Sequence, residues 1–374
     1  MQSIGVGLIG TGYMGKCHAL AWNAVAPTFG DVTRRPRLVH LAEVNADLAA
    51  QKAGEFGFEK STGHWRDVVA DPEVDIVSIT TPNAFHAEMA IAAMDAGKHV
   101  WCEKPMATSM ADADAMLAAA RRSERVTALG YNYIQNPAMR HMKALVDQGA
   151  IGAVNHIRIE MDEDFMADAK APFGWKSEAG SGHGALDDFG VHPLSLLTVF
   201  FGRVARVVAD LAKPYPSRQT ADGTSRAVET ADIANILFRL EDGVSGVLQL
   251  NRSAWGRKGR IAVQIFGSEG TIAFDQERMN ELQIFEARGP VANQGFRTIL
   301  TGPVHPPYAR FVAAPGHGLG FNDLKVIEAR EILKRVAGEP AHIIDFETGH
   351  SIERTVAAMA RSFETGGWTD VGSS

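Results

Sequence analysis

The feature that most constrains this sequence is the glycine-rich stretch GTGYMG at residues 10–15, which directly follows the apolar run IGVGLI at residues 4–9. Such a run predicts a short buried strand, and the helical pattern that begins at Tyr13 completes a unit of strand, turn and helix. In this setting the first glycine permits a tight turn, the second lets the backbone approach a pyrophosphate, and the third permits close helix packing. We expect a dinucleotide-binding turn formed by Gly10, Gly12, Tyr13, Met14 and Gly15.

The alternation of strand and helix continues through residues 1–129. Strands are predicted at 4–9, 37–43, 75–80 and 99–102, and helices at 13–26, 46–56, 84–96 and 109–123. Repeated units of this kind with nearly continuous apolar strands are typical of a parallel sheet covered by helices on both faces. The sequence therefore predicts an α/β fold that begins with a Rossmann domain, a doubly wound parallel sheet, over residues 1–129.

Strand-like runs follow one another after residue 130, which predicts a second, α+β domain over residues 130–374. The runs are 153–161, 204–211, 232–239, 244–251, 260–266 and 270–274, with helical patterns at 185–200, 321–336 and 348–365. The turn signals EDG at 241–243 and GSEG at 267–270 favour hairpins, and hence a mainly antiparallel sheet. Residues 287–320 are rich in Gly and Pro and are expected to form a surface loop.

Length and composition agree with a protein of two globular domains. A chain of 374 residues exceeds the usual size of one domain, and a net charge of -7 without a dense Lys/Arg block argues against a nucleic-acid partner. No apolar run approaches the roughly 18 residues of a membrane span, and the first residues lack the basic segment of a signal peptide. We expect a cytoplasmic protein in which the two cysteines, Cys17 and Cys102, are ordinary thiols.

Glu43 stands at the end of the second predicted strand, where a dinucleotide fold places an acidic residue on the adenosine ribose. A carboxylate at that place repels a 2′-phosphate, so NAD is favoured over NADP. Arg34 or Arg35 could instead bind a 2′-phosphate, so NADP remains a possible cofactor.

The motifs TPNAFH at 81–86 and CEKP at 102–105 each follow a predicted parallel strand, at the end where ligands collect. The ammonium of Lys104 could orient or polarise a substrate oxygen there, or it could be an ordinary solvated loop lysine. The residues of these motifs expected at the cofactor are Thr81, Pro82, Asn83, His86, Glu103 and Lys104.

The stretch GSGHGALDDFGVHPLS at 180–195 places Asp188 and His192 four residues apart at a predicted helix start, and hence on one face. Imidazole titrates near neutrality, so His192 could accept a hydroxyl proton while Asp188 orients it or binds a hydroxyl. The alternative is an N-cap aspartate beside a packed histidine.

Taken together, GTGYMG, TPNAFH, CEKP and GALDDFGVHPLS resemble the glucose-fructose oxidoreductase / inositol dehydrogenase / rhizopine catabolism (Gfo/Idh/MocA) family over nearly the whole chain. The stretches AEVNADLA, GFRTILTGPVHP and HGLGFNDLKVIEA resemble most the branch that acts on anhydrosugars and inositols. The resemblance implies a second domain with a large open sheet that commonly forms oligomer contacts, and hence a homodimer or homotetramer.

The resemblance also implies where a substrate binds. The catalytic residues would be Lys104, Asp188 and His192, which would line the substrate site beside the nicotinamide together with Tyr131, Asn132 and Trp175. Two positions depart from the common pattern, because Ile134 stands where many relatives carry an arginine and Ser195 stands where an aspartate often follows the histidine.

The expected function is hydride transfer between NAD and a hydroxyl-bearing carbon of a sugar, anhydrosugar or inositol. No metal is expected, since nothing resembles HExxH. Two rival functions remain open: a glycosidase of related fold that retains NAD, and a sugar- and dinucleotide-sensing protein without chemistry.

Overall fold

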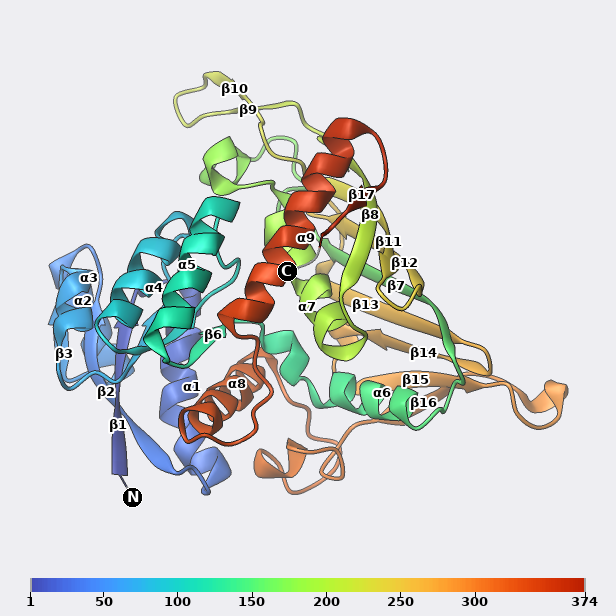
Figure 1. The fold of residues 1–374 in the computed structure, drawn as a ribbon, viewed down its shortest axis with the longest axis horizontal. Helices are drawn as coiled ribbons and strands as arrows, with labels where there is room; N and C mark the ends of the chain where they lie inside the picture. The colour runs from blue at the N-terminus through green and yellow to red at the C-terminus, as the bar shows by residue number, and fades with distance from the viewer. Residues whose placement is uncertain (1, 373–374) are drawn as a thin grey trace. The chain divides into compact units, whose positions relative to one another are not determined.

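The computed structural model describes residues 2–372, which form two compact units (Figure 1). Unit 1 comprises the residues up to Gln135 together with Leu319–His350, and unit 2 comprises Asn136–Gly318 together with the residues from Ser351 onward. The chain thus returns to unit 1 late in the sequence. The sequence pattern predicted a single boundary near residue 130 and did not anticipate this return.

A six-stranded sheet of parallel strands forms the centre of unit 1. Its spatial order is β3-β2-β1-β4-β5-β6. The strands are β1 (Gln2–Ile9), β2 (Arg34–Ala42), β3 (Lys60–Thr62), β4 (Ile76–Ile79), β5 (His99–Cys102) and β6 (Thr127–Leu129). The order reverses at β1, and crossovers to its two sides place helices on both faces of a sheet of this kind. The predicted doubly wound sheet is confirmed.

Two of the helices of unit 1 begin at a side-chain cap. The helices of this unit are α1 (Tyr13–Phe29), α2 (Ala46–Phe56), α3 (Trp65–Ala70), α4 (His86–Asp95), α5 (Met110–Ser123) and α8 (Phe321–Val336). Asn45 caps α2 by accepting from the Leu48 N–H, and Ser109 caps α5. Helix α8 packs against α1, with the rings of Phe321 and Tyr13 stacked at 6.1 Å.

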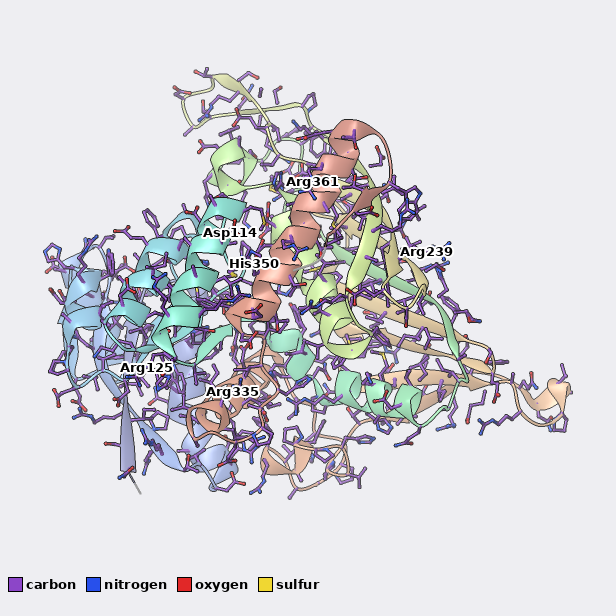
Figure 2. All side chains as sticks on the ribbon, viewed as in Figure 1. Asp114, Arg125, Arg239, Arg335, His350 and Arg361 are labelled. Carbon is purple, nitrogen blue, oxygen red and sulfur yellow. The ribbon has the colours of Figure 1, made fainter. Side chains whose placement is uncertain are left out.

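The first residues of α9 (Phe346–Thr365) also belong to unit 1. His350 Nε2 lies 2.6 Å from Asp114 Oδ1 of α5, and Figure 2 shows these two side chains next to each other. The Phe346 N–H donates to Thr127 Oγ1 at the start of β6. These contacts tie a segment from the end of the sequence to the edge of the parallel sheet.

A nine-stranded sheet organises unit 2, in the order β16-β15-β14-β13-β7-β12-β11-β8-β17. Its strands are β7 (Val154–Glu163), β8 (Val204–Ala212), β11 (Ile233–Leu240), β12 (Ser245–Asn251), β13 (Lys258–Gly267), β14 (Gly270–Asp275), β15 (Glu281–Glu286), β16 (Arg297–Leu300) and β17 (Thr369–Asp370). Neighbours are antiparallel except β12 and β7, which are parallel. The predicted mainly antiparallel sheet and its two hairpins are confirmed.

One face of the large sheet is buried, as the strict alternation of buried and exposed side chains along β11 shows. Helices α6 (Pro137–Asp147) and α7 (Val191–Phe200) contact strands of this sheet, and Ser362 of α9 accepts from the Ala209 N–H of β8 (Figure 1). A separate hairpin consists of β9 (Ser217–Gln219) and β10 (Ser225–Ala227).

Several elements of unit 2 escaped prediction, among them α6, β15 and β16. Helix α6 begins at Pro137 after the cap residue Asn136, a start signal that the sequence does contain. Strand β16 forms one edge of the sheet beside β15, and β16 falls inside the segment 287–320 expected to be a loop. An edge strand buries little, so it leaves no clear apolar alternation, and the loop prediction is wrong for Arg297–Leu300.

None of the helices among residues 2–372 combines the length and the apolar character needed to cross a membrane.

Candidate active site

The parallel strands of unit 1 end in register, which sets a row of predicted site residues along one edge of the sheet. Ile9 is paired with Ala42 and with Ile79, Ile79 with Cys102, and Cys102 with Leu129. The residues that follow these strand ends are Gly10, Glu43, Thr80, Glu103 and Gly130. Because ligands of doubly wound sheets bind at the carboxyl ends of the strands, this row is the candidate cofactor edge.

The glycines of the first turn differ in their surroundings. Gly10 has a φ of 93° and a side chain there would meet the Thr80 carbonyl, while a Cβ on Gly15 would lie 2.3 Å from the Gly10 oxygen. A Cβ on Gly12 would have nothing within 4 Å. Gly12 also precedes α1, whose N-terminus has no side-chain cap there. The turn thus offers an open approach to backbone N–H groups at a helix N-terminus, which fits a pyrophosphate.

Glu43 lies beside this turn. Its Oε2 accepts from the N–H of Thr11 at 3.1 Å and from Thr11 Oγ1 at 2.7 Å, and Oε1 accepts from the Val44 N–H. These donors hold the carboxylate at the end of β2, the place that a ribose-binding acid occupies in this fold.

The segment after β4 carries Thr81, Pro82 and Asn83, and the buried His86 is the first residue of α4. The two ring nitrogens of His86 lie 2.8 Å from the Pro105 carbonyl oxygen and 3.0 Å from that of Thr81. Burial lowers the pKa of this imidazole below its ordinary value. His86 therefore joins the two loops that were predicted to meet the cofactor.

The loop after β5 begins with a buried carboxylate and continues with the half-buried Lys104. Glu103 Oε2 accepts from the Lys104 N–H at 3.3 Å, and Oε1 lies 2.5 Å from Lys325 Nζ and 2.9 Å from His18 Nε2. Burial favours the neutral acid, but Lys325 and His18 outweigh it and lower the pKa of Glu103 well below its usual range. Glu103 is thus an ionised group that faces the interior of unit 1.

Residues after β6 are buried as well. Tyr131, Asn132 and Ile134 are all at most 2% exposed, and the last two lie in a 3₁₀ turn (Asn132–Gln135). Ile134 is an apolar side chain at the position where the family resemblance implies an arginine. The expected substrate contacts of Tyr131 and Asn132 stay predictions.

In unit 2 the segment expected as a helix start is a π-helical turn (Leu186–Gly190) that runs directly into α7. Asp188 lies in the turn and His192, which is 6% exposed, lies in the first turn of α7. Wider turns of this kind are frequent at functional sites. Ser195 is buried and donates to the His192 carbonyl, so its hydroxyl bonds the helix itself.

Asp188 is held by two cations that the sequence analysis did not identify. Its Oδ2 lies 2.5 Å from Lys176 Nζ and 3.3 Å from Arg252 Nη1. Arg252 is buried and also bonds Asp232 Oδ1 at 2.8 Å. Lys176 lies 5.2 Å from the ring centres of both Trp175 and Phe165. The site in unit 2 is therefore the Asp188 carboxylate, which is paired with two cations, one of which lies beside two aromatic rings.

The neighbouring Asp187 is buried, and this burial raises its pKa to about 6. Its carboxylate accepts from the His183 N–H and would collide with any side chain at Gly182. Asp187 thus fixes the glycine-rich loop that precedes the π-helical turn, while Asp188 is the one of the pair that meets Lys176 and Arg252.

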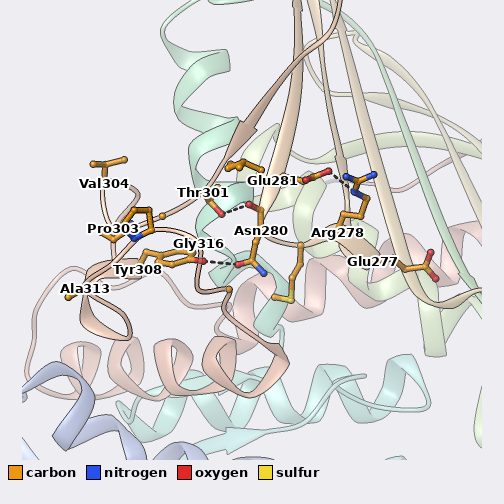
Figure 3. A pocket seen from close by; sticks show the side chains of 15 residues that line it. Glu277, Arg278, Asn280, Glu281, Thr301, Pro303, Val304, Tyr308, Ala313 and Gly316 are labelled. Atoms are coloured by element: carbon orange, nitrogen blue, oxygen red, sulfur yellow. Dashed lines mark hydrogen bonds and ion pairs between the residues drawn. The ribbon is translucent and has the colours of Figure 1, made fainter.

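A pocket elsewhere in unit 2, of about 690 Å³, is shown in Figure 3. It is lined by residues of 277–281 and 300–318, and Asn280 inside it accepts from the Tyr308 hydroxyl. None of the predicted site residues lines it. Across residues 2–372 the structure contains no cluster of three His, Cys, Asp or Glu side chains suited to a metal ion.

The structure thus gathers the predicted cofactor residues along one edge of unit 1, and it places Asp188 and His192 in consecutive turns within unit 2. The residues that sequence reasoning missed are Lys176, Asp232, Arg252, Lys325 and His18. Lys176 stands next to the predicted Trp175, but no spacing rule marks it, and the other four are buried partners that only tertiary packing brings together.

Comparison with known proteins gives the same assignment for both halves of the chain. Residues 4–159 match an oxidoreductase family with an NAD-binding Rossmann fold, and residues 139–273 match the GFO/IDH/MocA C-terminal domain. A levoglucosan dehydrogenase of Pseudarthrobacter phenanthrenivorans is 35% identical over 99% of this chain and 99% of that protein. A myo-inositol 2-dehydrogenase of Thermotoga maritima is 26% identical over 76% of this chain and 79% of that protein.

Solved structures agree in fold over the full length. A levoglucosan dehydrogenase in complex with NADH and levoglucosan has a TM-score of 0.95 at 35% identity, and covers 100% of both chains. A levoglucosan dehydrogenase in complex with NADH and L-sorbose has a TM-score of 0.95 at 35% identity over 99% of both chains.

Proposed function

The chain belongs to the Gfo/Idh/MocA family of oxidoreductases, and on this basis we propose that it is an NAD-dependent dehydrogenase that oxidises a secondary hydroxyl of an anhydrosugar or a related pyranose. The levoglucosan dehydrogenase that matches over the full chain supports an anhydrosugar as the substrate. The similarity to a myo-inositol 2-dehydrogenase is the reason to test cyclic polyols as substrates too. The observation that carries the proposal is the in-register row of strand ends beside the open glycine turn.

The residues present fit NAD. The open space at Gly12 and the N–H groups at the start of α1 suit a pyrophosphate, and the Glu43 carboxylate suits the 2′- and 3′-hydroxyls of a ribose. The same carboxylate disfavours a 2′-phosphate. Thr81, Pro82, Asn83 and Lys104 would contact the rest of the cofactor. When bound, NAD⁺ supplies the hydride acceptor.

The side chains of the chain supply binding and proton transfer. His192 accepts the proton of the substrate hydroxyl as it becomes a carbonyl. Asp188 accepts a hydrogen bond from a substrate hydroxyl, and its ion pairs with Lys176 and Arg252 hold the carboxylate in place. Lys104 donates to the oxygen of the reacting carbon, which orients the substrate.

The planar side chain of Trp175 extends this proposed sugar site. It is 54% exposed and lies next to Lys176 at the start of a 3₁₀ turn (Trp175–Ser177). Exposed aromatic faces pack well against the apolar C–H face of a pyranose ring. We propose on this ground that Trp175 contacts the substrate, and Tyr131 and Asn132 of unit 1 stay predicted substrate residues.

The test is NADH formation by the purified protein with NAD⁺ or NADP⁺ and a panel of levoglucosan, L-sorbose, myo-inositol and simple pyranoses. We expect net NADH with NAD⁺ and a preference for one anhydrosugar or pyranose. His192→Ala should lower kcat by about a hundredfold or more while NADH still binds. Full turnover by His192→Ala would remove the assigned base, and tight NADH binding without net NADH from any substrate would favour the glycosidase or the sensor.

The cytoplasmic location and the homodimer or homotetramer stay predictions. Size-exclusion chromatography with light scattering tests the second of them.

A further inference from the structure

A buried ionic cluster lies behind the loop that carries Lys104. It consists of His18 of α1, Glu103 at the end of β5, and Lys325 and Glu328 of α8, and all four side chains belong to unit 1. Lys325 is 0% exposed, and Glu103 is the most exposed of the four at 5%. A lysine is almost never fully buried unless it is paired, so this one must have a structural reason to be there.

Glu103 connects this cluster to the backbone of Lys104. One carboxylate oxygen, Oε1, accepts from Lys325 Nζ at 2.5 Å, and the other, Oε2, accepts from the Lys104 N–H at 3.3 Å. Lys325 Nζ also donates to the Gly130 carbonyl oxygen at 3.3 Å and pairs with Glu328 at 2.9 Å. A continuous chain of polar contacts thus runs from α8 to the backbone of the predicted catalytic lysine.

The surroundings leave the Glu103 carboxylate little freedom. A Cβ on Gly130 would lie 2.4 Å from Oε1, so only glycine permits the carboxylate this position. On another side the His18 ring stacks on Trp101 at 3.6 Å and presents Nε2 to the same oxygen. Lys325 Nζ lies 5.2 Å from the Trp101 ring centre.

Lys325 is the cation that this carboxylate depends on. Burial lowers the pKa of His18 to about 4, so His18 is neutral at physiological pH and contributes a hydrogen bond without a charge. Burial opposes the charge on Lys325 too, but Glu103 and Glu328 raise its pKa and keep it protonated. Removing one partner of such a buried pair leaves the other charge uncompensated.

We propose that Lys325 is a positioning residue for Lys104, because through Glu103 it fixes the backbone from which the Lys104 side chain extends. This inference rests on the proposed function, in which Lys104 orients the substrate oxygen. Lys325 is fully buried and acts through Glu103, not by contact with the substrate. A displacement of about 1 Å at a reacting group can cost on the order of a hundredfold in rate.

The test compares Lys325→Met with two variants of α8, Glu328→Gln and Ile332→Ala, at a temperature below all melting points. Glu328→Gln retains the Lys325–Glu103 pair, and Ile332→Ala removes buried volume from α8 without changing any charge. We expect Lys325→Met to lower kcat with the best substrate of the panel by about tenfold to a hundredfold while the Kd for NADH changes less than about threefold. Both control variants should retain kcat within about threefold.

A double variant separates positioning from general damage. If Lys325 acts through Lys104, Lys325→Met should slow the residual reaction of Lys104→Met no further. An unchanged kcat in Lys325→Met would overturn the inference. So would a double variant whose loss of kcat equals the product of the losses in the two single variants. If Lys325→Met does not fold, Glu103→Gln removes the same charge pair at constant volume, and unchanged kcat there would overturn it equally.

Failure of the proposed function looks different. Full turnover by Lys104→Met alone would remove the role of Lys104, whatever the result with Lys325→Met.

Discussion

Among single residues, Gly12 and Gly15 illustrate two different reasons for a glycine in the turn. A methyl at Gly12 meets open space, whereas a methyl at Gly15 meets the Gly10 carbonyl oxygen at 2.3 Å. We predict that Gly12→Ala melts like the wild type but binds NADH about tenfold more weakly, because the methyl lies where the backbone must approach the pyrophosphate.

Gly15→Ala is the matched substitution, and it should lower the melting temperature because the turn must shift. Thermal melts and fluorescence titration with NADH measure both effects. Wild-type affinity in Gly12→Ala would contradict the assignment of this turn to the cofactor.

A second residue-scale prediction concerns the choice of cofactor. Glu43 holds its carboxylate beside Thr11 at the end of β2, so Glu43→Gln removes the charge and retains the shape. NADP⁺ should then gain about tenfold or more in kcat/KM relative to NAD⁺, because the repulsion of a 2′-phosphate is gone. An unchanged ratio in steady-state assays would show that another residue, such as Arg34 or Arg35, controls this choice.

The residues of the site differ in how far the sequence revealed them. The glycine turn was found because its function requires fixed spacing within one strand–turn–helix unit, and Glu43 was found because it stands at the end of the second strand. Lys325 and Arg252 were not, since a lysine in an amphipathic helix and an arginine after a strand look like solvated residues. Only the packing of distant segments makes them buried partners of Glu103 and Asp188.

Among the helices, α8 carries Glu328, a buried carboxyl group whose pKa is raised. Glu328 faces Lys325, Glu103 and the backbone of Tyr131, and its burial raises its pKa from 4.5 to about 7. The folded protein therefore binds more protons than the unfolded chain between these two pH values. This contribution to stability is complete below about pH 4.5 and is lost as the pH rises through about 7.

We predict that Glu328→Gln reduces the pH dependence of unfolding between pH 5 and pH 8. The wild-type loss from this group is at most roughly 3 kcal/mol. Denaturant unfolding at several pH values, followed for both proteins, measures it. Parallel curves for the wild type and Glu328→Gln would show that Glu328 titrates normally.

The π-helical turn Leu186–Gly190 is an element that sequence periodicity could not reveal. Its residues have the same apolar and polar order as an ordinary helix start, and the predicted helix over 185–200 is present. The wider turn brings Gly190 so close to β12 that a Cβ would lie 3.2 Å from Leu250. That contact is a matter of tertiary packing and has no local signature.

At the scale of the whole molecule, the order of strands was more predictable than the division of the chain. Repeated strand–helix units fix a parallel sheet locally, and consecutive strands with tight turns fix an antiparallel one. The return of Leu319–His350 to unit 1 depends instead on contacts such as α8 with α1 and His350 with Asp114. Such long-range contacts are invisible in a pattern that is read along the chain.

The most direct test of the proposed dehydrogenase mechanism is to follow the transferred hydride. The best substrate of the panel, prepared with deuterium on every carbon, is incubated with the protein and NAD⁺, and the reduced cofactor is analysed by mass spectrometry. We predict one deuterium in each NADH and loss of the signal in His192→Ala. Reduced cofactor without deuterium, or deuterium transfer undiminished in His192→Ala, would contradict the proposed dehydrogenase mechanism.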